Sequence, residues 1–124
     1  MNNIRKLGIW LDHSNAYLME LSNNIVIQKV VSELTNNETE FNFYKGEKLI
    51  HKKEQHLQLR YYKKIGDIIK KYQDVLLFGP TDAKNELLNK IKTDHLFVGI
   101  KFEVKNSDKM TEDQMKTFVR DYFK

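Results

Sequence analysis

Three short apolar segments lie within the first 31 residues, and this feature restricts the fold more than any other. Residues 7–11, 16–21 and 25–31 are rich in the branched and aromatic residues that favour strands. The stretches between them, residues 12–15 and 22–24, are short and polar, and such side chains bond their own backbone in tight turns. Three strands joined by tight turns predict an antiparallel meander.

The rest of the chain alternates between helical and strand patterns. Apolar residues recur at helical spacing in residues 53–72, 83–91 and 111–122, and the last of these segments opens with the Thr-Glu-Asp-Gln sequence of a capping box. Residues 75–78 and 99–104 are short apolar strands between these helices. The order β-β-β-α-β-α-β-α predicts an α/β fold of three layers, with one mixed sheet and helices packed on it.

Length and composition fit one cytoplasmic domain covering residues 1–124. Hydrophobic residues make up 40% of the chain and charged residues 31%, which is a normal globular balance. There is no cysteine, which suits a reducing compartment. No apolar run is long enough for a signal peptide or a membrane span, so we expect neither, and we expect no contact with a membrane.

The pattern fails between residues 35 and 52, where we predict a long loop. Polar residues fill positions 35–40, and the aromatic residues that follow have no evident partner element. Long loops in compact domains are often functional or disordered. The candidate partner-contact residues in this loop are Phe41, Phe43, Tyr44, Lys45 and Lys48. The alternative interpretation is that the aromatic residues fold down as a small satellite core.

Positive charge is concentrated in one part of the chain. Nine Lys or Arg residues against three acids lie between Lys45 and Lys71, so this segment carries +6 and the remainder −2. A basic helix face near aromatic residues is suited to RNA phosphates and bases, and nothing in the pattern points to DNA in particular. The candidate RNA-binding residues are Lys52, Lys53, Arg60, Lys63, Lys64 and Lys71. The alternative is an ordinary solvated helix face.

Acidic residues do not predict a catalytic centre. Asp12 ends the first strand, where nucleases of the ribonuclease H type place a carboxylate that helps to hold two magnesium ions. That chemistry needs several convergent carboxylates, and the other acids do not fall at strand ends in a convincing set. The acids considered are Asp74, Asp82, Glu86 and Asp108. We therefore interpret Asp12 as a turn residue that binds the backbone amides of Ser14 or Asn15.

Histidines and glycines do not predict a cofactor or metal site either. His13, His51, His56 and His95 lack metal-ligand spacing. The sequence Gly-Pro-Thr at residues 79–81 precedes a helix but has neither the glycine-rich fingerprint nor the Lys-Ser/Thr pair of a phosphate loop. A strand-to-helix turn capped by Thr81 or Asp82 is the simpler interpretation. We predict no catalytic residue, no cofactor and no metal.

Two stretches resemble the middle domain of eukaryotic and archaeal-type class 1 release factors and of Pelota. Residues 8–21 (GIWLDHSNAYLMEL) are similar to the opening hairpin of that domain, and residues 75–84 (VLLFGPTDAK) to its later strand, glycine turn and helix. The basic helix of residues 53–72 lies in the matching place between them. The resemblance covers nearly the whole chain, and it implies a ribonuclease-H-like fold.

The segment expected to carry release-factor chemistry departs from that family. In release factors, the loop after the third strand carries a Gly-Gly-Gln motif that enters the peptidyl transferase centre and promotes ester hydrolysis. Here residues 35–52 contain a single glycine, Gly46, and no glutamine follows it. The backbone freedom of paired glycines is therefore absent, and we expect no peptide release. The Pelota middle domain also lacks the motif and serves in ribosome rescue.

Our leading hypothesis is a non-catalytic RNA- or ribosome-associated module that acts in translation or ribosome rescue. The first alternative is a protein-interaction or homo-oligomeric module that uses the loop of residues 35–52. The second is a divergent hydrolase or nuclease. Steep salt dependence of binding separates the first two, and metal-dependent cleavage identifies the third.

Overall fold

The computed structural model describes residues 4–33 and 47–124, with the side chains of residues 47–53 left undescribed. The order of elements confirms the predicted β-β-β-α-β-α-β-α arrangement and adds one short 3-10 helix. The elements are β1 (Lys6–Leu11), β2 (Asn15–Glu20), β3 (Ile27–Val31), α2 (Glu47–Ile69), β4 (Asp74–Gly79), α3 (Ala83–Ile91), η1 (His95–Phe97), β5 (Lys101–Asn106) and α4 (Glu112–Tyr122).

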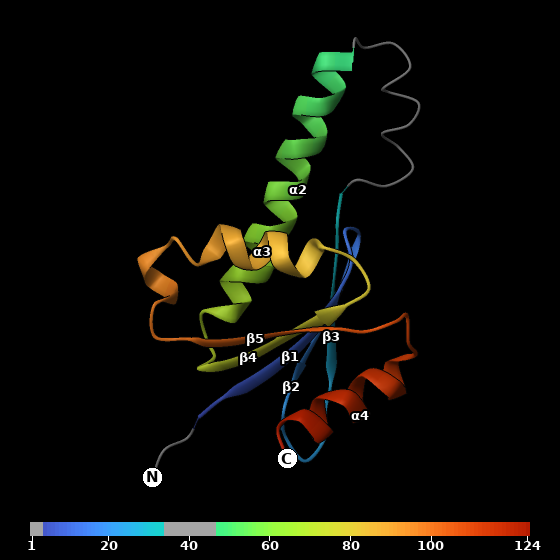
Figure 1. Ribbon diagram of the computed structural model, residues 1–124, viewed down its shortest axis with the longest axis vertical. Helices are drawn as coiled ribbons and strands as arrows, with labels where there is room; N and C mark the ends of the chain where they lie inside the picture. Colours follow the sequence, from blue (N-terminus) through green and yellow to red (C-terminus); the bar gives the residue numbers. More distant parts are fainter. Residues whose placement is uncertain (1–3, 34–46) are drawn as a thin grey trace.

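One mixed five-stranded sheet organises the domain (Figure 1). Its strand order is β3-β2-β1-β4-β5, so the first strand lies at the centre. Strand β1 pairs antiparallel with β2, as tight turns require, and β2 pairs in the same way with β3. The pairs β1–β4 and β4–β5 are parallel, and each crossover carries a helix. The predicted mixed sheet is therefore confirmed.

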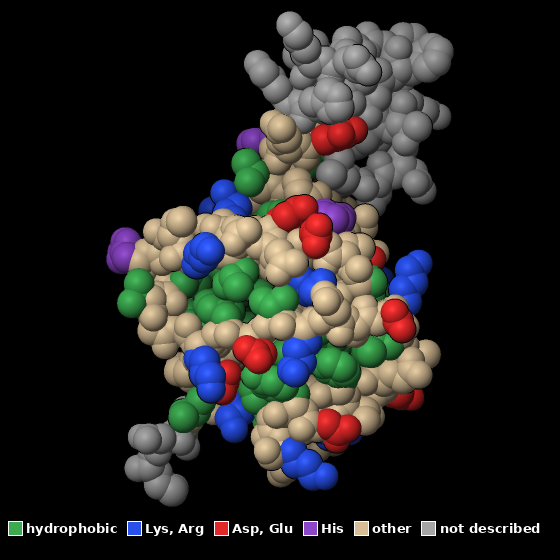
Figure 2. Space-filling model, in the orientation of Figure 1, with side chains coloured by type: hydrophobic (Ala, Val, Ile, Leu, Met, Phe, Trp, Pro, Cys, Tyr) green, Lys and Arg blue, Asp and Glu red, His purple; other side chains and the backbone are tan. Residues whose placement is uncertain are grey.

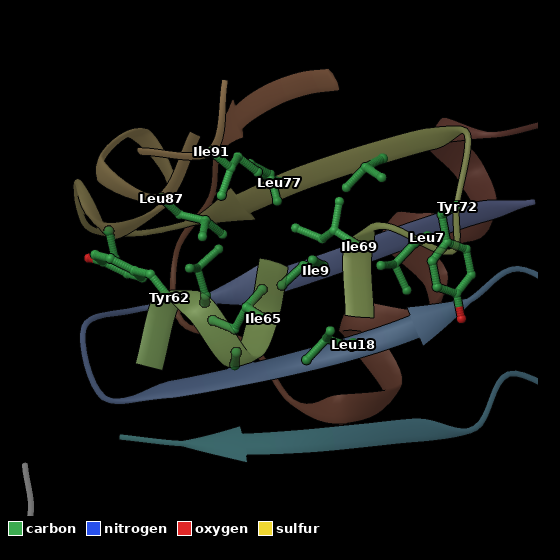
Figure 3. Packing of buried hydrophobic residues seen from close by; sticks show 14 of the residues in the cluster. Leu7, Ile9, Leu18, Tyr62, Ile65, Ile69, Tyr72, Leu77, Leu87 and Ile91 are labelled. Carbon is green, nitrogen blue, oxygen red and sulfur yellow. The ribbon is translucent and has the colours of Figure 1, made fainter. Parts of the chain in front are cut away.

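The two faces of the sheet bury separate cores. Alternate residues of a strand point to opposite faces, so Ile9 and Leu77 contribute to one core while Trp10 and Phe78 contribute to the other. Helices α2 and α3 cover the first face, where Ile65, Ile69, Leu87 and Ile91 pack on the sheet (Figure 3). Helix α4 covers the second face through Met115 and Val119. The result is the three-layer arrangement expected from the sequence.

A glycine on the central strand allows α4 to approach closely. A Cβ added at Gly8 would overlap the Cγ2 atom of Val119, which is fully buried in α4. The amino end of α4 is fixed by the predicted capping box, in which Thr111 Oγ1 accepts from the Gln114 amide at 3.2 Å and the Gln114 side chain accepts from the Thr111 amide at 2.9 Å.

The predicted loop of residues 35–52 is wrong at its carboxyl end. Residues 47–52 belong to α2, so Lys48 and Lys52 lie in a helix. A helical pattern is recognisable in a sequence only where one face packs on a core, and Figure 1 shows that the first turns of α2 project beyond the sheet. Phe41, Phe43, Tyr44 and Lys45 lie outside the described residues.

Several strand boundaries differ from the predicted ones by one or two residues. Strand β3 begins at Ile27 rather than at residue 25, and β5 extends to Asn106 rather than ending at residue 104. The short helix η1 was not predicted, because three residues are too few to show a period.

No helix in the described part of the chain has the length and apolar content needed to cross a membrane.

Candidate nucleic-acid interface

The candidate interface is the outer face of α2, opposite the side that packs on the sheet. Tyr61, Ile65 and Ile69 recur at helical spacing and are buried on the inner side of α2, whereas Arg60, Lys63 and Lys64 are exposed. The exposed residues Arg60, Lys63 and Lys64 therefore lie on one helical face, as the sequence predicted, and exposed Lys71 follows in the turn after the helix. Lys52 and Lys53 belong to the same helix, but their side chains are outside the described set.

One carboxylate holds two of these cations. Arg60 Nη1 lies 2.9 Å from Glu33 Oε2, and Lys64 Nζ lies 3.3 Å from Glu33 Oε1. The hydrogen bond from Lys64, together with the charge of Arg60, keeps the pKa of Glu33 below its ordinary value. Because Glu33 follows β3, these bonds tie the end of the meander to the outer face of α2.

A second carboxylate on the helix itself is shared in the same way. Asp67 accepts from Lys63 Nζ and from Lys70 Nζ, at 3.3 Å in each case. Slight burial opposes ionisation of Asp67, but hydrogen bonds from Lys70 and Lys63 lower its pKa overall. Each of these two acids thus bonds two cations, so the face keeps a positive charge. Exposed ion pairs of this kind hold their partners weakly.

Asp12 has the turn role predicted for it. Its Oδ1 atom accepts from the Ser14 amide at 2.8 Å and from the Asn15 amide at 2.7 Å. Parallel pairing with β1 places Asp74 beside Lys6, at the opposite end of the strand from Asp12. Among the described residues, no group of three or more His, Asp or Glu side chains is arranged to hold a metal ion.

A polar cluster that the sequence did not predict joins α2 to α3 and the first turn. The Tyr62 hydroxyl donates to Glu86 Oε1 at 2.7 Å, and His13 Nε2 lies 3.2 Å from both carboxylate oxygens of Glu86. Burial raises the pKa of Tyr62, and the bond to Glu86 adds to this effect. Partial burial of Glu86 is outweighed by its bonds with Tyr62 and His13, so the Glu86 pKa is lowered.

No sequence signal marks this cluster. His13 sits in a polar turn and Glu86 in the first turn of a helix, and both are common positions for such residues. Tyr61 makes a similar link, because its hydroxyl donates to the Asp12 carbonyl at 2.9 Å. The two neighbouring tyrosines therefore anchor α2 to the carboxyl end of β1 and to α3.

The turn after β4 satisfies its own polar groups. Gly79 has φ +148°, and a Cβ there would overlap the Leu11 carbonyl oxygen, so only glycine fits. Thr81 Oγ1 accepts from the Ala83 amide at 3.2 Å, whereas the side chain of Asp82 makes no capping bond. Of the two predicted caps, the structure thus uses the threonine and not the aspartate.

A buried lysine completes this turn. Lys84 is only 2% exposed, and its Nζ atom donates to the Thr81 carbonyl at 2.5 Å. Lysine at the second position of a helix is normally solvated, so the sequence did not indicate its burial. Its contact stabilises the turn between β4 and α3.

Neither a protein-family model nor a curated protein sequence matches this chain, whereas solved structures do. Pelota from Archaeoglobus fulgidus aligns with 97% of the chain at a TM-score of 0.63 and 9% identity. Pelota from Thermoplasma acidophilum aligns with 94% at a TM-score of 0.60 and 12% identity. The chain spans about a third of the length of each Pelota structure, 32% in both cases. At the level of fold, the resemblance to the middle domain of Pelota and release factors is confirmed.

Proposed function

We propose that the chain is a non-catalytic RNA- or ribosome-associated module, cytoplasmic, and acting in translation or ribosome rescue. The observation that carries this proposal is the Pelota fold, which extends over nearly the whole chain. The local excess of positive charge on α2 supports it further. The proposal assigns no reaction to the chain, because the segment in the place of the release-factor loop lacks the Gly-Gly-Gln motif.

Binding would use phosphate contacts on the outer face of α2. Arg60, Lys63 and Lys64 are exposed along one side of the helix, where their present partners are the carboxylates of Glu33 and Asp67. Phosphate oxygens can take the place of these carboxylates, and each phosphate contact releases condensed counterions from the RNA. Such binding is independent of sequence and weakens steeply as salt rises.

The direct test is sedimentation with ribosomes from the same cell type on sucrose gradients at low and high salt. The test variant is Lys63→Gln, Lys64→Gln and Lys71→Gln combined, which removes three exposed cations from the candidate interface. We expect wild-type protein to travel with ribosomal particles at low salt and the variant to remain at the top. For isolated single-stranded RNA, losing three contacts reduces the slope of log K against log salt by about 2.

A matched control separates the helix face from total charge. Lys101→Gln, Lys109→Gln and Arg120→Gln remove the same number of exposed cations from β5, the loop after it and α4. The control should sediment like the wild type. If both variants lose sedimentation with ribosomes equally, binding depends on the total charge of the protein and not on the outer face of α2. If wild-type protein stays at the top of the gradient at low salt, ribosome association is refuted.

A variant of Glu33, the carboxylate shared by two cations, should strengthen RNA binding instead of weakening it. Glu33→Gln removes the acid that now engages both Arg60 and Lys64, so it frees two cations without adding any. We expect tighter RNA binding and a steeper salt dependence than in the wild type, measured by fluorescence anisotropy with labelled oligouridylate. Unchanged affinity would mean that these two cations do not contact the nucleic acid.

A further inference from the structure

A groove of about 490 Å³ lies where α2 meets α3 and η1. Its apolar lining comes from Leu59, Tyr62, Ile91 and Phe97, and Leu59 is 46% exposed at its edge. Figure 2 shows apolar and basic side chains side by side on the surface around α2 and α3. The volume falls in the range of sites that accept a small ligand or an anchoring side chain.

A glycine in the helix keeps the groove open. Gly66 lies in the interior of α2 and lines the groove, and a Cβ added there would sit 3.4 Å from both Ile91 Cγ2 and Phe97 Cζ. An alanine would therefore be accommodated at ordinary contact distance, so packing does not require glycine. Glycine inside a helix costs about 1 kcal/mol relative to alanine. A side chain larger than that of alanine at residue 66 would extend into the groove and fill it.

The rim of the groove is positively charged. Four cations, Arg60, Lys63, Lys70 and Lys90, face two carboxylates, Asp67 and Asp94. Lys63 and Lys70 share the single carboxylate of Asp67. Lys90 is exposed near the end of α3 and makes no ion pair within residues 4–33 and 54–124. Asp94 is engaged in capping η1, since its Oδ1 accepts from the Leu96 amide at 3.0 Å.

We propose that this groove binds an acidic segment of a partner protein that inserts one apolar side chain. The apolar floor provides the site for the anchor, and the cationic rim is complementary to flanking Asp and Glu residues. The proposal goes beyond RNA or ribosome association and does not depend on it.

The aromatic residues of the groove favour a peptide over a nucleic acid. Recognition of a single-stranded base needs an open ring face on which the base can stack. Tyr62 is 3% exposed and Phe97 is 6% exposed, so neither offers such a face. The ammonium of Lys70 also lies 5.7 Å from the centre of the Phe97 ring and covers it. A flexible aliphatic or aromatic side chain needs only apolar walls, which the groove provides.

The test is an NMR titration of the full chain, labelled with nitrogen-15, with defined synthetic probes. The main probe is the peptide Glu-Asp-Leu-Phe-Asp-Glu. The comparison probes are Glu-Asp-Ser-Ser-Asp-Glu, which lacks the apolar anchor, Lys-Lys-Leu-Phe-Lys-Lys, which reverses the charge, and oligouridylate. We expect the main peptide to shift the amide signals of Gly66, Ile91 and Phe97, and we expect at least tenfold weaker effects from the comparison peptides.

Two variants locate the binding on the protein. Gly66→Leu fills the groove and should abolish the shifts at Ile91 and Phe97. Lys90→Glu tests the rim without touching the core, so it remains informative if Gly66→Leu fails to fold. We expect Lys90→Glu to weaken the peptide about tenfold, whereas Lys92→Glu, which is exposed but does not line the groove, should leave the affinity unchanged.

Three outcomes would overturn the proposal. The first is an absence of groove shifts with the acidic apolar peptide. The second is an equal response to the serine peptide or to the basic peptide. The third is a set of groove shifts produced by oligouridylate, which would assign the groove to nucleic acid. Ribosome association is tested with the combined Lys63, Lys64 and Lys71 variant, and of these three residues only Lys63 lines the groove. The peptide titration reads the groove through Gly66 and Lys90, which that variant leaves unchanged, so either idea can fail alone.

Discussion

The inner and outer faces of α2 belong to one helix but are held by contacts of different strength. On the inner face, Ile65 and Ile69 are fully buried against the sheet (Figure 3). Tyr61 also donates a hydrogen bond to the Asp12 carbonyl. On the outer face, Lys63 and Lys64 are exposed and make ion pairs at 3.3 Å. The inner contacts therefore fix the fold, while the exposed ion pairs of the outer face contribute little to it.

The two faces of α2 contribute very different free energies to the stability of the fold. Truncation of a buried aliphatic side chain typically costs about 2–5 kcal/mol, whereas an exposed ion pair contributes about 0–1 kcal/mol. Outer-face variants consequently test binding without unfolding the domain, which makes the ribosome and RNA experiments interpretable.

The largest effect is expected on the inner face. Ile65→Ala removes a side chain that is buried between the sheet and α2, so it should lower the free energy of unfolding by about 2–5 kcal/mol. Urea denaturation measures this difference, and Lys64→Ala on the adjacent outer position is the matched control, with a loss below about 1 kcal/mol. Similar losses for both variants would contradict the separation of the two faces.

Periodicity explains how much of the fold could be predicted. The three strands at the start and the apolar stripes of α2, α3 and α4 are local patterns, so their order and type were correct. The start of α2 at Glu47 was missed, and Figure 1 shows that the first turns of this helix project beyond the sheet.

The candidate site was less predictable because it depends on residues far apart in the chain. The spacing of Arg60, Lys63 and Lys64 correctly placed them on one face of α2. It did not reveal that Glu33, which follows β3, pairs with two of them. The bond between Tyr62 and Glu86 likewise arises only when α2 and α3 pack together. Such pairings require the tertiary structure.

An intermediate effect is expected where the inner face borders polar groups. Tyr62→Phe removes the hydroxyl that donates to Glu86, so it should lower the free energy of unfolding by about 1 kcal/mol at pH 7. Urea denaturation of the two proteins over a pH series measures this difference.

The stability difference between wild type and Tyr62→Phe should also depend on pH. The pKa of Glu86 is lower in the folded protein than its ordinary value of 4.5, so its ionised form stabilises the fold above that pH. This stabilisation is lost as the pH falls through the folded-state pKa. The difference between wild type and Tyr62→Phe should therefore narrow below about pH 4.5. A difference that widens in acid would contradict the assignment of Glu86 as the charged acceptor.

The smallest effect is expected within the outer face. Lys63 and Asp67 form an exposed pair four residues apart, and Lys70 also bonds Asp67. A double-mutant cycle with Lys63→Gln and Asp67→Asn, followed by urea denaturation, should give a coupling free energy of at most about 0.5 kcal/mol. Screening should remove the coupling at 1 M salt. A coupling above about 1 kcal/mol that persists in salt would mean that this face holds its ions firmly. Phosphates or partner carboxylates would then have to compete with fixed internal contacts, and the division between a structural and an exchangeable face of α2 would fail.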